Sequence, residues 1–337
     1  MTQQRPPERP RWLVWVTRIS LVIGLGALAV TVVLVGPSQI SHHLRSIGWF
    51  FFAIIGVELL SSVLDATAIY FLADGPRWRN VVVAQLAGRG VNSITPGGNL
   101  GEAVKVGLLS RHGSMRRVVA AVMYVDLIAV VVGLSVIAIG CAATPFLFDV
   151  PHGAKIALAF GALIAGGAAG AIVWLLRKGM LGTLANALAR VHIISRKRRE
   201  KWNKILHEVD SRLSGKDASH RRKALACIGV SQLVQRVLTY MTVLAAGYHL
   251  GAGQYLALLS AGVLVSWVST IIPLGLGISE GGNVAVFTMI GAPASLGLAL
   301  ALARRVNQVV FATIGFIVLA TERVASHVHV RFARTSH

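Results

Sequence analysis

The stretch from Val91 to Glu102 reads Val-Asn-Ser-Ile-Thr-Pro-Gly-Gly-Asn-Leu-Gly-Glu, and the stretch from Val268 to Glu280 reads Val-Ser-Thr-Ile-Ile-Pro-Leu-Gly-Leu-Gly-Ile-Ser-Glu. One stretch lies in each half of the chain. Each interrupts an apolar segment and then places a carboxylate beyond the break. Matching interruptions in two halves of a membrane chain predict a transporter-like binding site near the bilayer midplane. The residues expected to shape the broken helices are Pro96, Gly98, Gly101, Pro273, Gly275 and Gly277.

The composition assigns the chain to the membrane. Of its 337 residues, 55% are hydrophobic and 14% are charged, and the mean hydropathy is +0.68. A soluble protein of this size is far less apolar. The formal net charge of +20 could suggest nucleic acid as a partner. However, the Lys and Arg residues gather in loops between apolar segments, which is the positive-inside pattern, so we exclude nucleic acid.

The pattern predicts an all-α integral membrane protein with one membrane domain, 12–322, between polar tails at 1–11 and 323–337. A helix needs about 20 apolar residues to cross the hydrocarbon core. Six full spans meet this need: 12–36, 48–73, 118–143, 154–176, 223–248 and 296–321. The broken motifs lie in two further segments, 81–110 and 255–290, each long enough for a re-entrant hairpin of two short helices.

Loop charge predicts the orientation of the chain. The basic loops and both termini are assigned to the cytoplasm of a bacterial-type inner membrane, which makes the first hairpin enter from inside and the second from outside. Repeats 48–143 and 223–322 are therefore predicted to be inverted. Flanking polar positions support this register, because Glu58 and Gln235 precede their motif prolines by equal separations. Asp126 and Arg304 likewise follow their motif glutamates by equal separations.

The segment 177–222 is the only sizeable extramembrane piece that the pattern predicts. Its apolar residues recur at helical spacing, and the run 196–204 is strongly basic. These features predict amphipathic helices on the cytoplasmic leaflet. A positive-inside anchor is favoured over a dedicated lipid-recognition patch.

Ten ionisable residues fall inside the predicted membrane segments. A charge at a helix centre costs roughly 2.5–3.5 kcal/mol, so these side chains are expected to face inward, to pair or to line a wet cavity. They could instead hold helices together, although uncharged polar residues would suffice for that. The ten are Glu58, Asp65, Arg89, Glu102, Lys105, Asp126, Arg236, Glu280, Arg304 and Arg305.

These residues and their polar neighbours form the predicted binding site. Free N–H groups of the half-helices after Gly98 and Gly277 suit an anion, and arginines suit a phosphate. Glu102 could instead pair with Lys105 one turn later. No metal or cofactor is expected. The predicted substrate-binding residues are Asn92, Glu102, Lys105, Gln235, Arg236, Glu280, Arg304, Arg305 and Asn307. Those for charge balance or a proton are Glu58, Asp65 and Asp126.

The motifs resemble the membrane region of the lysylphosphatidylglycerol synthase, or flippase-like, family. The residues that carry the resemblance are Asn92–Lys105, Ile272–Glu280 and the pair Arg304-Arg305. Family members that make aminoacylated lipid add a soluble aminoacyltransferase domain, whereas this chain ends shortly after its last predicted span. The resemblance therefore implies a stand-alone, non-enzymatic member that moves a lipid headgroup between leaflets. Some stand-alone members are associated with hopanoid pathways or polyprenyl-linked glycans.

Three functions follow from these observations. The first is a flippase-like transporter for an amphiphile with an anionic or phosphate-bearing headgroup: a phospholipid, an aminoacylated phospholipid, or a polyprenyl-linked or hopanoid-related lipid. The second is a non-transporting scaffold or regulator of a lipid-biosynthetic enzyme or glycosyltransferase. The third is a secondary transporter of a small solute. Membrane lipids are the expected partners, and a homodimer remains open.

Overall fold

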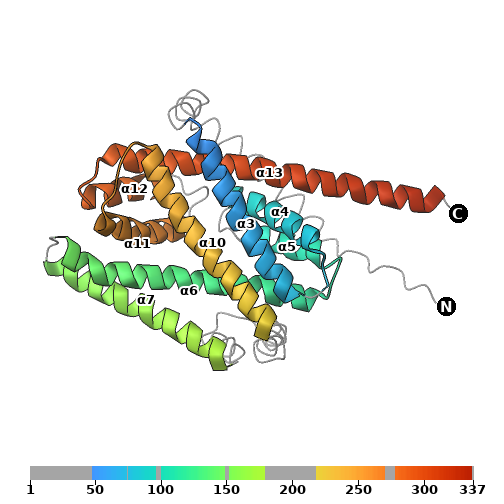
Figure 1. Ribbon diagram of the computed structural model, residues 1–337, viewed down its shortest axis with the longest axis horizontal. Coiled ribbons are helices and arrows are strands. Elements are labelled where there is room, and N and C mark those ends of the chain that lie inside the picture. The colour runs from blue at the N-terminus through green and yellow to red at the C-terminus, as the bar shows by residue number, and fades with distance from the viewer. Residues whose placement is uncertain are drawn as a thin grey trace.

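The computed structural model describes residues 48–73, 75–95, 100–148, 152–178, 218–269 and 278–335, and this described part is helical throughout, without a strand (Figure 1). Its helices are α3 (Phe50–Ala73), α4 (Trp78–Ile94), α5 (Leu100–Leu109), α6 (Met115–Leu147), α7 (His152–Lys178), α10 (Ala218–Ala245), α11 (Ala252–Ser269), α12 (Ile278–Met289) and α13 (Ala294–Thr335).

Five described helices are long and apolar enough to cross a membrane, and they correspond to five of the six predicted spans. They include Phe50–Ala73, Met115–Leu147, Lys155–Leu176, Ser219–Ala245 and Leu300–Thr321. The sixth predicted span, 12–36, lies outside the described residues, as does the predicted N-terminal tail, 1–11. Most of the predicted basic segment, 179–217, also lies outside them. The chain is therefore a multi-pass membrane protein, and its described part is helical.

Each interrupted segment forms a pair of short helices. Helices α4 and α5 pack against each other on either side of residues 96–99, and α11 and α12 do so on either side of residues 270–277. The new half-helices begin just after the predicted breaks, at Leu100 and Ile278. The re-entrant course of each pair through the bilayer remains a prediction.

The same neighbours recur in the two predicted repeats. Helix α3 packs on α10, α4 packs on α13, and α6 packs on α11, as expected if α3–α6 and α10–α13 exchange places. The packing is not equal, because α3 contacts α4 and α6 extensively whereas α10 contacts α11 and α13 only sparsely. Space is therefore left beside α10. The inverted relation between the repeats remains a prediction.

Two helix crossings depend on small residues. At the α4–α13 crossing, a Cβ added to Gly90 would lie 2.6 Å from the Cα of Gly315. At the α6–α11 crossing, a Cβ added to Gly140 would lie 1.5 Å from Ser260 Oγ, and this hydroxyl donates to the carbonyl of Val136 over 3.0 Å. Small residues let helix backbones approach closely in membranes, so these positions fix the distances between the two repeats.

Helix α13 is longer than the sequence suggests. The predicted span ends at 321 and a tail was expected from 323, but the helix continues to Thr335. No Pro or Gly stop signal follows the span, which explains the continuation. At 1.5 Å per residue its 42 residues extend roughly 63 Å, so in Figure 1 it projects beyond the bundle.

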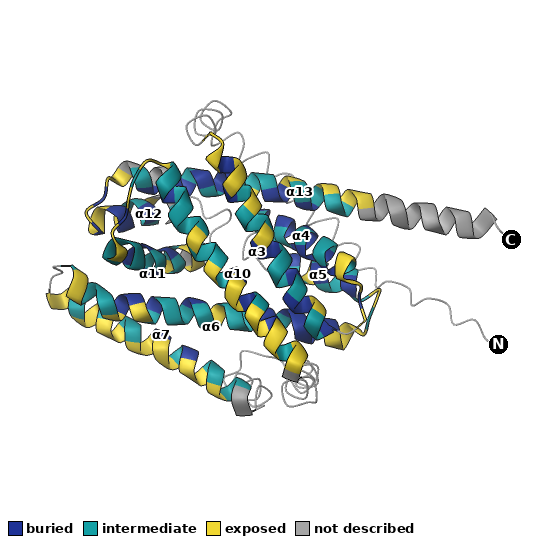
Figure 2. Cartoon of the chain, viewed as in Figure 1, coloured by how far each residue is buried: buried dark blue, intermediate teal, exposed yellow. Residues whose placement is uncertain are grey.

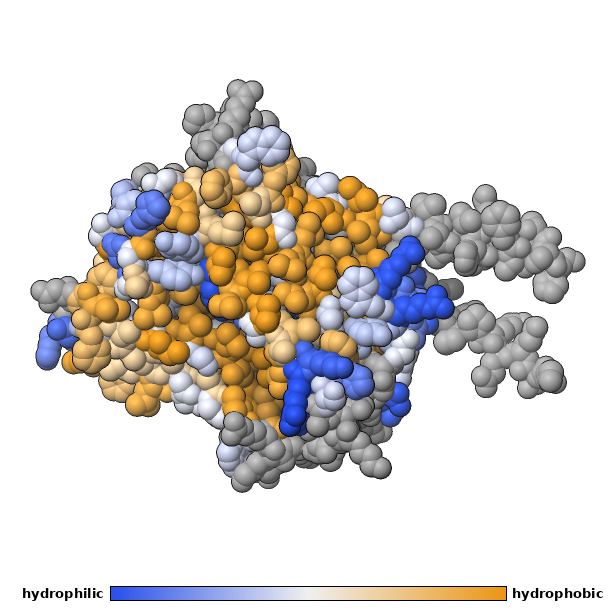
Figure 3. All heavy atoms as spheres, viewed as in Figure 1, coloured by the Kyte–Doolittle hydropathy of each residue, from blue (hydrophilic) through white to orange (hydrophobic). Residues whose placement is uncertain are grey.

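Burial separates the central helices from a peripheral one. Helices α3 to α6 carry many buried residues toward the bundle interior (Figure 2). Helix α7 packs chiefly on α6, and its outer face exposes large apolar side chains such as Phe160 and Leu163. In the view of Figure 3 the surface over α3 and α10 is predominantly hydrophobic, as expected for a lipid-facing wall.

Candidate functional site: a polar cavity between the repeats

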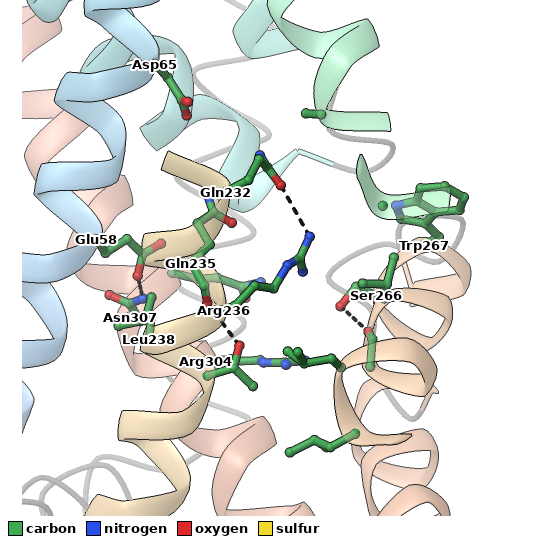
Figure 4. A pocket seen from close by; sticks show the side chains of 18 of the residues that line it. Glu58, Asp65, Gln232, Gln235, Arg236, Leu238, Ser266, Trp267, Arg304 and Asn307 are labelled. Carbon is green, nitrogen blue, oxygen red and sulfur yellow. Dashed lines mark hydrogen bonds between the residues drawn. The ribbon is translucent and has the colours of Figure 1, made fainter. Parts of the chain in front are cut away.

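A cavity of about 540 Å³ lies beside α10, among helices from both predicted repeats (Figure 4). Its polar lining comes from α3, α4, α10, α11 and α13, and its apolar lining comes largely from α6 and α11. A pocket of this size accommodates a lipid headgroup. The polar side chains that line it are Glu58, Asp65, Ser93, Gln232, Gln235, Arg236, Thr239, Ser266, Arg304, Asn307 and Gln308.

Glu58 joins three helices at the wall of the cavity. Its carboxylate forms an ion pair with Arg89 of α4 and accepts a hydrogen bond from the amide of Asn307 on α13. Arg89 also donates to Ser62 Oγ over 2.6 Å, and its guanidinium lies 4.9 Å from the ring centre of Phe311. Arg89 is thus neutralised and held in place from three sides, which makes it a structural cation.

Arg236 and Arg304 differ from Arg89, because neither forms an ion pair with a described carboxylate. Arg236 donates to Gln232 over 3.3 Å, and its Nε is buried without a hydrogen-bond partner. Arg304 extends from α13 toward α11, where a Cβ added to Gly262 would lie 3.9 Å from its guanidinium. Because neither arginine is paired with a carboxylate of the described residues, this part of the cavity is suitable for an anion.

Hydrogen bonds between α3 and α10 fix the polar face opposite α13. The hydroxyls of Ser61 and Ser231 lie 2.9 Å apart, and Gln235 donates its amide to Ser61 over 3.0 Å. Both serines are fully buried. Polar residues recur at i, i+3, i+4 and i+7 on both helices, and these two polar stripes meet at the seam, which positions Gln235 and Arg236 along the cavity. The stripes are Glu58, Ser61, Ser62 and Asp65 on α3, and Gln232, Gln235, Arg236 and Thr239 on α10.

A second polar cluster ties α5 to α4. Asn92 Nδ2 donates to Glu102 Oε1 over 2.9 Å, and its Oδ1 accepts from the backbone N–H of Gly101 over 2.7 Å. Lys105 Nζ pairs with the same Glu102 oxygen over 2.8 Å. Glu102 therefore forms the ion pair with Lys105 that the helical spacing suggested as an alternative. A Cβ on Gly101 would lie 2.0 Å from the carbonyl oxygen of Gly88, so only glycine fits there.

The predicted site residues therefore do not all meet in the cavity. Glu58, Asp65, Gln235, Arg236, Arg304 and Asn307 line the cavity. Asn92, Glu102, Lys105, Asp126 and Arg305 are absent from its lining, and the first three form the α4–α5 cluster. The side chain of Glu280 lies outside the described part of the structure, as do Pro96, Gly98, Pro273, Gly275 and Gly277.

Several lining residues were not assigned from the sequence. Gln232 belongs to the same polar stripe as Gln235, so the helical spacing already contained that signal. Ser266 and Trp267 lie on α11 in an apolar run that offers no periodic cue. Arg89 was recognised as an ionisable membrane residue, but only its contact with Glu58 shows what it does.

Of the comparisons with known proteins, the comparison with protein families gives a match. A family model described as the lysylphosphatidylglycerol synthase TM region matches residues 18–315. No curated protein and no solved structure matches the chain.

Proposed function

The chain belongs to the lysylphosphatidylglycerol synthase TM region family, and from that premise we propose that it moves an amphiphile with an anionic headgroup between membrane leaflets. The observation that carries the proposal is the pair Arg236 and Arg304, two cations in the polar cavity without a carboxylate partner among the described residues. An arginine away from water is costly unless an anion compensates it. A phosphate bound by two guanidinium groups provides this compensation.

The surroundings of the cavity favour a lipid over a soluble solute. Val130 of α6 and Trp267 of α11 line the cavity and are each 39% exposed. Leu264 of α11 and Leu233 and Val237 of α10 are exposed nearby on the same helices. Exposed apolar side chains on a membrane helix face acyl chains. A headgroup can therefore occupy the polar interior while its tails remain in the bilayer.

The volume restricts the headgroup. A cavity of about 540 Å³ is within the range of small-molecule sites and suits a glycerophosphate-sized group better than a large oligosaccharide. We therefore rank phospholipids and their aminoacylated forms above polyprenyl-linked glycans. The proposed localisation is a bacterial-type inner membrane with both termini in the cytoplasm, and no catalytic step is assigned to the chain.

Reconstitution into proteoliposomes tests this function. Labelled phosphatidylglycerol, its aminoacylated form and a polyprenyl phosphate are each followed for protein-dependent movement between leaflets. We expect movement of a phospholipid class that Arg304→Ala abolishes. Arg222→Ala is the matched control, because Arg222 is exposed on α10 and does not line the cavity. Equal rates in the two variants, or no movement by folded protein, would contradict transport and favour the scaffold hypothesis.

A further inference from the structure

A second, smaller cavity of about 60 Å³ lies next to the main one. It is lined by residues of α3, α10 and α13, and it shares four of them with the main cavity. The shared residues are Leu238, Thr239, Arg304 and Asn307. Because these four side chains border both spaces, they form a common wall between them.

The two cavities follow one another along the helices. On α3, Ile54 lines the small cavity and Glu58 lines the large one, about 6 Å further along the helix axis. On α10, Thr242 lines the small cavity and Gln232 the large one, with the wall residues between them. On α13, Leu300 lines the small cavity and Gln308 the large one. Because α10 runs antiparallel to α3 (Figure 1), the two spaces follow each other in the same spatial order on these two helices and lie in series.

The wall has few contacts to break. Helices α10 and α13 contact each other sparsely, in contrast to the close seam between α10 and α3. Arg304 forms no ion pair with a described carboxylate, whereas Asn307 is held by the hydrogen bond from its amide to Glu58. Leu238 and Arg304 are therefore the movable part of the wall. Displacing Leu238 and Arg304 therefore breaks no ion pair of the described structure.

We infer that Leu238 and Thr239 of α10, together with Arg304 and Asn307 of α13, form an internal gate on the headgroup path. The inference rests on the proposed function, since a gate matters only if something passes. The small cavity is the vestibule on the far side of the gate, toward the end of α10. A phosphate in the main cavity attracts Arg304 out of the wall, so headgroup binding favours opening.

Thiol accessibility tests the gate without a transport assay. In a background carrying Cys141→Ala and Cys227→Ala, single cysteines are introduced at three depths of α10: His249→Cys in the turn after the helix, T242C in the vestibule and Q232C in the main cavity. A charged, membrane-impermeant thiol reagent is added separately to each side of the membrane. From the side where α10 ends, we expect the first two to react and Q232C to be protected.

Truncating the wall should remove this protection. Leu238→Ala, or Thr239→Ala if the first variant folds poorly, is expected to raise the labelling rate of Q232C to that of T242C. Val237→Ala is the matched control, because its side chain is 47% exposed and lines neither cavity. Reaction of Q232C at the T242C rate in the parent, protection of T242C, or no effect of either wall variant overturns the gate. Loss of lipid movement with an intact accessibility pattern contradicts the transport function alone.

Discussion

Glu58 of α3 and Arg89 of α4 form an ion pair inside the helix bundle, with side chains only 13% and 20% exposed. Arg304 of α13 lines the same cavity as Glu58 but forms no ion pair with a described carboxylate. The basic residues of the bundle therefore have two different roles. Arg89 and Lys105 are neutralised by neighbouring carboxylates, whereas Arg236 and Arg304 face the cavity.

The Glu58–Arg89 pair should be important for stability. Arg89→Met leaves Glu58 as an uncompensated, largely buried charge, and we expect up to about 3 kcal/mol of destabilisation, after allowance for its partial exposure. The double variant Glu58→Gln, Arg89→Met removes both charges and should recover part of the loss. Unfolding of purified protein in detergent measures this. A double variant as unstable as the sum of the singles would argue against a direct interaction.

The α4–α13 crossing gives a second prediction. Gly90→Ala places a methyl group 2.6 Å from the Cα of Gly315, so one helix must move, and overpacking of this kind costs about 1–3 kcal/mol. Gly229→Ala is the control, because nothing lies within 4 Å of its added Cβ and alanine favours a helix over glycine. Melting temperatures of the two variants should move in opposite directions. Equal shifts would show that the crossing is looser than described.

Asn92 holds the start of α5 through both ends of its amide. Asn92→Ala removes its hydrogen bonds to Gly101 and Glu102, and we expect a cost of about 1–3 kcal/mol for the groups left unsatisfied. Asn92→Asp keeps the acceptor but places a carboxylate against Glu102, so it should be at least as unstable. Adding Glu102→Gln returns a donor to the pair and should rescue Asn92→Asp. If Glu102→Gln does not rescue Asn92→Asp, the Asn92–Glu102 contact is not what stabilises the packing of α5 against α4.

Much of the architecture was predictable because a membrane helix needs a long apolar run. Five spans and the two interrupted segments follow from hydropathy, Pro and Gly alone. The length of α13 was not predictable from hydropathy, because a helix that leaves the bilayer continues until a stop signal ends it. Hydropathy predicts which residues of a helix lie in the lipid, but it does not predict the residue at which the helix ends.

The residues of the candidate site could be predicted from the sequence, but the pairs that they form could not. Helical spacing brought Glu58, Gln235 and Arg236 to inward faces. It could not decide which arginine Glu58 neutralises, because Arg89 and Arg304 stand on different helices and only the packing of α3 against α4 makes the choice. For the same reason the sequence left open whether Glu102 binds substrate or pairs with Lys105, and the structure shows the ion pair.

The cavity arginines should behave in the opposite way to Arg89. Removing Arg304 creates no unpaired described carboxylate, so Arg304→Met should leave stability unchanged or raise it, as substitutions in binding sites often do. The same variant should lose ligand-dependent stabilisation. Phosphatidylglycerol that binds the folded protein at 100 times its dissociation constant raises stability by about 2.7 kcal/mol, whereas binding to the variant should add little.

Thermal unfolding with increasing phosphatidylglycerol in a neutral detergent measures both effects in one titration. Arg304→Lys serves as the graded variant, because lysine keeps the charge but loses the bidentate geometry, so an intermediate response is expected. An uncharged diacylglycerol controls for the acyl chains. If Arg304→Met proves as destabilising as Arg89→Met and still responds to phosphatidylglycerol, Arg304 is a structural cation, and the anion site must be sought elsewhere in the chain.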